Sequence, residues 1–176
     1  GRDGYMIPKK IHYCWFGKGK KSKLALKCIR SWRQYCPEYE VIEWNEENFD
    51  IDMNGYTRMC YAEKKYAYLS DYVRLWVVEK YGGIYFDTDV EVIRSLEELL
   101  RNDAFFCFEN KQYVASGLGF GSVAHGKVIQ AMLKEYEILL DGKNGVRMCP
   151  KLNTQALVAL GLKQNGRKQN VCEAVI

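Results

Sequence analysis

The hydrophobic and polar positions of the chain follow two patterns in turn, short apolar runs typical of strands and apolar positions at helical spacing. The predicted strands cover Lys10–Phe16, Glu40–Trp44, Ile84–Phe86, Ala104–Phe108 and a glycine-broken stretch at Val114–Gly121. The predicted helices cover Ser22–Cys36, Tyr56–Tyr81 and Lys127–Leu140. Pro37 ends the first helix, and Gly82 and Gly83 suit the carboxyl end of the second, where a positive φ is common.

Strands that alternate with helices predict an α/β fold with a mostly parallel sheet flanked by helices. The chain of 176 residues has no internal repeat and no low-complexity linker. This length is enough for one domain with a sizeable core, so we expect a single domain over residues 1–176. In such folds ligands bind where the strands have their carboxyl ends, and candidate site residues are expected there.

The composition fits a globular protein, with 48% apolar and 27% charged residues. A net charge of +4 is mild and gives no support for a nucleic-acid partner. No apolar run approaches the ~18 residues of a membrane span, and the first ten residues lack a signal-peptide core. Seven cysteines without a CxxC pair favour reduced thiols and a cytoplasmic protein.

One short stretch, GGIYFDTDVEV at residues 82–92, joins an apolar strand to two aspartates. Because side chains alternate along a strand, Asp87 and Asp89 are predicted to point to the same side. Neighbouring carboxylates raise each other's pKa unless a cation neutralises them, so a basic group or a divalent metal is expected beside them. Asp50 and Asp52 share the spacing, but no strand precedes them, and we interpret that pair as a solvated loop.

A second unusual pair, Asp71 and Arg74, lies in the predicted helix within LSDYVRLW. On an exposed helix face such a pair is a surface ion pair that contributes a few tenths of a kcal/mol. The neighbouring positions, however, are apolar nearly all round, which predicts a buried helix. Buried charges need partners and often belong to functional sites, so the functional interpretation is favoured.

Two blocks of sequence together resemble a known family. IPKKIHYCWFG and AYLSDYVRLWVVEKYGGIYFDTDV are similar to the DxD-motif sugar transferases of glycosyltransferase family 32, which includes capsular-polysaccharide transferases and yeast mannosyltransferases of the Golgi. The second block also resembles the glucosyltransferase domain of large clostridial toxins. FGSVAHGKVIQAML and CPKLNT are similar to later segments of the family, with Cys149 at a position where the family has glycine.

The resemblance implies a GT-A fold, which is Rossmann-like, and a reaction. A hexose would pass with retention from a UDP- or GDP-sugar to a glycan or lipid-linked acceptor, in surface polysaccharide synthesis. The implied cofactor is Mn²⁺ or Mg²⁺. Family members usually continue with a late segment that supplies a further metal ligand, so we expect this chain, which ends at Ile176, to lack it.

Carried over by position, the resemblance also implies roles for single residues. Asp89 would ligate the metal, and Asp87 would bind the donor's ribose or sugar and touch the metal directly or through water. Asp71 and Arg74 would hold sugar hydroxyls and the diphosphate region. The other donor-binding residues would be Trp15, stacked on the nucleobase, Tyr85 beside the diphosphate, and Ala67 and Ser70 along the pocket.

Two other classes of function stay open at the level of the sequence. A haloacid-dehalogenase-like phosphohydrolase also has a strand that ends in Asp-x-Asp, although here Val90 and Glu91 follow and the motif lies in the middle of the chain. A domain that binds a nucleotide-sugar or glycan without transferring it is the other alternative. His12 and His125 are predicted to be structural.

A run of basic residues precedes and enters the first predicted helix. It consists of Lys18, Lys20, Lys21, Lys23, Lys27, Arg30 and Arg33. Such a run is usually a solvated surface, and the alternative is contact with an anionic membrane, where lipid-linked acceptors reside. We therefore expect a cytoplasmic location, with peripheral contact at the inner face of the membrane as the alternative.

Overall fold

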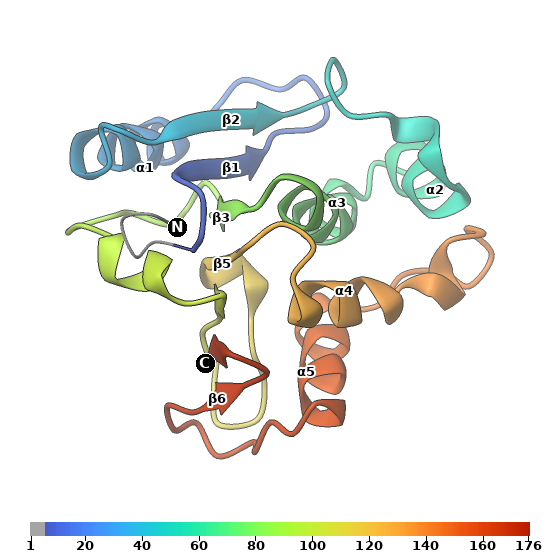
Figure 1. Cartoon of the computed structure of the whole chain (residues 1–176). Helices are drawn as coiled ribbons and strands as arrows, with labels where there is room; N and C mark the ends of the chain where they lie inside the picture. The colour runs from blue at the N-terminus through green and yellow to red at the C-terminus, as the bar shows by residue number, and fades with distance from the viewer. Residues whose placement is uncertain (1–5) are drawn as a thin grey trace.

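The computed structural model describes residues 6–176, which form one seven-stranded sheet with helices packed against it (Figure 1). The strands are β1 (Lys10–Cys14), β2 (Glu40–Trp44), β3 (Gly83–Tyr85), β4 (Ala104–Phe105), β5 (Phe120–Ser122), β6 (Asn170–Val171) and β7 (Ala174–Val175). The α-helices are α1 (Lys23–Tyr35), α2 (Gly55–Ala62), α3 (Tyr66–Tyr81), α4 (Lys127–Lys134) and α5 (Cys149–Ala159). The α/β fold class is confirmed.

The sheet is mixed, in the order β2-β1-β3-β5-β4-β7-β6. β1 pairs in parallel with β2 and β3, and β4 pairs in parallel with β7. β5 returns beside β4 after the loop 106–119, so both of its pairings are antiparallel, as is the β6–β7 hairpin. The prediction of a mostly parallel sheet therefore holds for β2, β1 and β3 and for the β4–β7 pair, whereas the other three pairings are antiparallel and the sheet as a whole is mixed.

The long helix predicted over Tyr56–Tyr81 is two helices, α2 and α3. Lys64, between them, has a φ of 56°, and the Lys65 N–H donates to the Cys60 carbonyl oxygen at 2.7 Å, which closes the end of α2. The helix predicted over Lys127–Leu140 likewise ends at Lys134 and continues as a short 3-10 helix, Glu137–Leu139.

Two buried apolar clusters lie against the sheet. Ile11 and Tyr13 of β1 belong to the cluster that includes the inner face of α1, while Cys14 belongs to the cluster built around α3, α4 and α5. Because side chains alternate along β1, α1 lies on one side of the sheet and α3, α4 and α5 lie on the other.

His12 is a structural residue of this core, as predicted. Its Nδ1 accepts a hydrogen bond from Trp44 Nε1 at 3.0 Å, so its Nε2 carries the proton and donates to the Gly82 carbonyl oxygen at 2.8 Å. Burial lowers the pKa of His12, which keeps the ring neutral. The bond to Gly82 holds β1 against the end of α3, next to the strand that leads to the aspartates.

Candidate functional site

A cavity of about 400 Å³ opens where β1 and β3 end. It is lined by Cys14, Trp15, Phe16, Tyr66, Ala67, Ser70, Asp71, Arg74, Tyr85, Asp87, Thr88 and Asp89. All eight residues to which the sequence analysis gave roles in the site are among them. Three separate segments meet here: the end of β1, the first half of α3 and the chain that follows β3.

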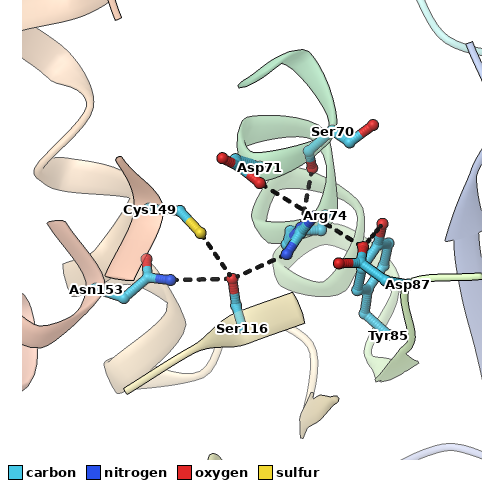
Figure 2. Close-up of polar contacts among 8 residues, drawn as sticks. All are labelled: Ser70, Asp71, Arg74, Tyr85, Asp87, Ser116, Cys149 and Asn153. Carbon is cyan, nitrogen blue, oxygen red and sulfur yellow. Dashed lines mark hydrogen bonds and ion pairs between the residues drawn. The ribbon is translucent and has the colours of Figure 1, made fainter. Parts of the chain in front are cut away.

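Arg74 is the centre of the site and is only 3% exposed. Its Nη2 lies 3.1 Å from Asp71 Oδ1 and 2.9 Å from Asp87 Oδ1, so one nitrogen binds both carboxylates (Figure 2). Its Nε donates to the Ser70 carbonyl oxygen at 3.2 Å, and the guanidinium carbon lies 4.7 Å from the centre of the Tyr85 ring. The sequence pattern was therefore right about burial: this is a buried, fully partnered charge.

Two opposing effects, burial and the charge of Arg74, set the pKa of Asp71. Burial raises the pKa of Asp71 to about 6, and the nearby charge of Arg74 opposes that rise. Its side chain still has 17% of its surface exposed, toward the cavity that it lines. Near neutral pH Asp71 is mostly ionised, so it can accept hydrogen bonds from hydroxyl groups of a ligand.

Asp87 and Asp89 reach the cavity by a turn and not along a strand. β3 ends at Tyr85, and the Val90 N–H donates to the Asp87 carbonyl oxygen at 3.1 Å. The prediction that strand alternation aligns the two carboxylates is wrong in its mechanism, although both line the cavity. Asp87 Oδ1 accepts hydrogen bonds from Arg74 and from the Tyr85 hydroxyl, the latter at 3.0 Å.

The donor set fits a divalent cation that shares its coordination with a ligand. Among residues 6–176, no group of three or more His, Cys, Asp or Glu side chains could hold a metal ion. Asp89 is exposed at the cavity, and Asp87 has one oxygen engaged by Arg74. Mg²⁺ is commonly bound by one or two carboxylates together with phosphate oxygens and water, which this pair can accommodate.

Trp15 lines the cavity directly after β1. Its Nε1 donates to the Gly19 carbonyl oxygen at 2.8 Å, and Lys21 Nζ lies 5.7 Å from the centre of its ring. The side chain is half-buried, packed on the core while it lines the cavity. The loop that Trp15 braces is fixed in turn by Glu46, whose carboxylate accepts from the Gly17 N–H and the Tyr61 hydroxyl.

Ala67 and Ser70 line the cavity from the first turns of α3. No side chain within the described residues caps this helix start, because Lys65 at the N-cap offers no hydrogen bond to it. Backbone N–H groups at a helix N-terminus favour anions. The position of Ala67 and Ser70 therefore suits the phosphate part of a ligand.

Three buried residues that complete the site were not predicted: Ser116, Cys149 and Asn153 (Figure 2). Ser116 Oγ accepts hydrogen bonds from Arg74 Nη1 at 3.3 Å and from Asn153 Nδ2 at 3.0 Å, and it lies 3.7 Å from Cys149 Sγ. They connect α5 to the arginine of α3. The glycines of SGLGFGS were the available signal in the sequence, since Gly117 follows Ser116.

The position of Gly117, next to Ser116, has no room for a side chain. A Cβ there would lie 2.5 Å from Asp87 Oδ2 and 3.2 Å from Arg74 Nη1. Glycines alternate along SGLGFGS, residues 116–122, and this pattern in the sequence predicts a strand face cleared for a substrate. Instead, Gly119 and Gly121 make room for Phe86 and Phe105, so these two glycines serve packing and only Gly117 adjoins the site.

Comparisons with known proteins agree with this geometry. The family described as "Glycosyltransferase sugar-binding region containing DXD motif" matches residues 22–106, which include α3 and both aspartates. A curated relative, inositol phosphoceramide mannosyltransferase 3 of Schizosaccharomyces pombe, is 32% identical over 106 residues, which cover 56% of this chain. The chain spans 29% of the length of that relative.

A solved structure, PaToxG Glycosyltransferase, superimposes with a TM-score of 0.68 at 19% identity, over 87% of this chain and 68% of that one. This likeness agrees with a GT-A fold. The family match covers just under half of the chain, and the fold and the cavity agree with this similarity to DxD-motif glycosyltransferases. The expected resemblance to glycosyltransferase family 32 is confirmed.

Proposed function

We propose that this domain transfers a hexose, with retention and with a divalent metal, from a UDP- or GDP-sugar to a glycan or lipid-linked acceptor. The observation that carries the proposal is the single cavity in which Arg74 binds both Asp71 and Asp87 while Asp89 stays exposed. This arrangement offers carboxylates to a sugar and to a cation, beside a helix start suited to phosphate.

Each part of the donor has a matching part of the cavity in this proposal. The base stacks on Trp15, the diphosphate lies near the start of α3 and Tyr85, and the sugar hydroxyls donate to Asp71. Arg74 acts by position: it fixes both carboxylates, so no reorganisation is needed when the donor arrives. Ser116 accepts a hydrogen bond from Arg74, and the missing side chain at Gly117 leaves room for the Asp87 carboxylate.

Asp89 and Asp87 would hold the Mn²⁺ or Mg²⁺, which supplies Lewis-acid stabilisation of the leaving nucleoside diphosphate. Transfer with retention needs no strong protein base opposite the donor, and we assign no nucleophile. Asp87 Oδ1 accepts from both Arg74 and Tyr85. Those bonds restrain the carboxylate that a haloacid-dehalogenase-like phosphohydrolase would use as its nucleophile.

A thermal-shift panel tests the proposal: UDP- and GDP-sugars, free UDP and GDP, and small phosphate esters, each with Mn²⁺ or with EDTA. A true donor at a hundredfold excess over its Kd should stabilise the fold by about 2.7 kcal/mol, and only with the metal. Asp89→Asn should remove this shift, while Asp52→Asn, in the other DxD-spaced pair, should keep it.

Turnover separates the remaining functions. Release of free sugar or of a transferred product from the stabilising donor supports the transferase. Binding of that donor without any turnover would indicate a non-catalytic nucleotide-sugar domain. Release of phosphate from small phosphate esters, with no shift from any nucleotide-sugar, would indicate a phosphohydrolase and contradict the proposal.

A further inference from the structure

Positive charge is concentrated in one segment of the chain. Residues 17–37 contain seven of the 26 basic residues and none of the 22 acidic ones. The rest of the chain therefore has 19 basic and 22 acidic residues, a net charge of −3, although the whole carries +4. The mild overall charge is therefore the sum of one strongly basic segment and a slightly acidic remainder.

The structure places these charges on one surface. Lys23, Lys27 and Arg30 follow one another at i, i+4 and i+7 of α1, so they form a row along the helix. All three are exposed, and the face of α1 that packs on the sheet is formed by Ala25, Cys28, Ile29 and Trp32. The row lies opposite this buried face and points away from the molecule. With Lys20 and Arg33 it forms the surface that we call the basic face of α1.

Most of these charges have no acidic partner. Within residues 6–176, Lys20, Lys23, Arg30 and Arg33 form no ion pair, and Lys27 lies at 3.9 Å from Glu91, both of them exposed. Lys21, beside the basic face, is different because it forms an ion pair with Glu43 at 2.6 Å. A row of unpaired cations attracts an extended anionic surface.

Two exposed leucines flank the row and favour a lipid bilayer over a nucleic acid as the anionic partner. Leu24 is 55% exposed and Leu26 is 44% exposed. Apolar side chains add nothing to contact with a sugar-phosphate backbone, whereas they can enter the boundary between headgroups and acyl chains of a bilayer. No helix within the described residues is long and apolar enough to cross a membrane.

The basic face of α1 also begins beside the cavity. α1 connects the parallel strands β1 and β2, so its first turn lies at the edge where β1 ends. Lys21 Nζ is 5.7 Å from the ring of Trp15, which lines the cavity. A bilayer bound to the basic face would thus lie next to the cavity mouth.

We propose that the basic face of α1, with Leu24 and Leu26, is a docking surface for an anionic lipid bilayer. Attraction to anionic headgroups provides most of the affinity, and the two leucines add apolar contact. The proposal goes beyond the proposed sugar transfer, and its test does not depend on nucleotide binding.

Vesicle co-sedimentation tests it with the whole chain. We expect binding to phosphatidylcholine vesicles that contain about one-third phosphatidylserine, weak binding without it, and loss of binding at high salt. Lys20→Gln/Lys23→Gln/Lys27→Gln should lower the partition coefficient by on the order of 100-fold, about fivefold per lysine. The matched control, Lys134→Gln/Lys143→Gln/Lys168→Gln, removes the same charge elsewhere and should change it little.

A second variant separates a lipid surface from other polyanions. Leu24→Ser/Leu26→Ser should weaken vesicle binding by about tenfold while leaving binding to dextran sulfate and duplex DNA unchanged. Circular dichroism and melting curves verify that all variants fold. Equal binding to neutral vesicles, equal loss in the control variant, or no effect of the leucine substitutions on vesicle binding would each overturn the proposal.

Discussion

At the scale of single residues, Asp71 combines a proposed role in the cavity with an unfavourable charge in the folded state. Burial raises its pKa to about 6, above the ~3.9 of an exposed aspartate. The folded protein therefore binds this proton more tightly than the unfolded chain does. The contribution of Asp71 to stability is present below about pH 4, is lost as the pH rises through about 6, and stays constant above that.

Asp71→Asn should consequently make the protein more stable at pH 8, by on the order of 2 kcal/mol, and equally stable at pH 4. Arg74 keeps its second carboxylate partner, Asp87, in this variant. Urea unfolding at both pH values measures the difference. Sugar transfer or donor hydrolysis should be lost in the same variant. A variant that is less stable at pH 8 would mean that the ion pair outweighs the burial of the charge.

Trp15 allows a test of base recognition apart from metal and phosphate. Stacking of a base on an aromatic ring contributes about 1–3 kcal/mol, and phenylalanine keeps only part of it. Trp15→Phe should therefore weaken UDP or GDP binding several-fold in calorimetry and leave pyrophosphate binding unchanged. Trp76→Phe, in a half-buried tryptophan that does not line the cavity, is the control. Equal weakening of pyrophosphate would assign Trp15 to the core alone.

At the scale of elements, the end of α2 is followed by a lysine whose backbone conformation is unfavourable for any residue with a Cβ. Lys64 has a φ of 56°, a conformation that costs a residue with a Cβ about 1–2 kcal/mol and glycine almost nothing. Lys64→Gly should raise the free energy of unfolding by about 1 kcal/mol in urea titrations. Lys64→Ala keeps the Cβ and should not, and an equal gain in both variants would refute this explanation.

The same helix end shows what the sequence could and could not predict. Apolar spacing gave the existence and type of most elements, but it runs on through AEKKY, where no Gly or Pro marks the break at Lys64. Antiparallel pairing of β5 depends on contacts with distant strands, which local patterns do not contain. The apolar helix around Asp71 and Arg74 and the strand before Asp87 marked these residues as site candidates, and the family resemblance added the other cavity residues that were given roles. Ser116 and Asn153 were missed because only folding brings them to Arg74, 42 residues or more away in sequence.

At the scale of the whole molecule, both apolar clusters lie against one sheet. Each cluster contains buried cysteines, whose reactivity measures how readily that part of the protein opens. Seven cysteines are free, and only Cys107 and Cys172 are exposed. Cys28 and Cys36 belong to the cluster under α1, while Cys14 and Cys60 belong to the cluster around α3. Burial raises the pKa of each of these four thiols, so each should react only after the protein opens.

If the domain unfolds as one unit, a thiol reagent followed by mass spectrometry should label Cys107 and Cys172 at once and the buried thiols at one common slow rate. Donor and Mn²⁺ at a hundredfold excess over Kd should then slow all buried thiols by about 100-fold, provided that labelling is slower than refolding. EDTA should abolish the protection. Cys14 lines the cavity. The alternative outcome is that the ligand protects Cys14 and Cys60 but leaves Cys28 and Cys36 at their original labelling rate. In that case the α1 side of the sheet opens separately from the cavity side. That outcome would contradict a single cooperative unit, because α1 would then come off the sheet while the donor stays bound.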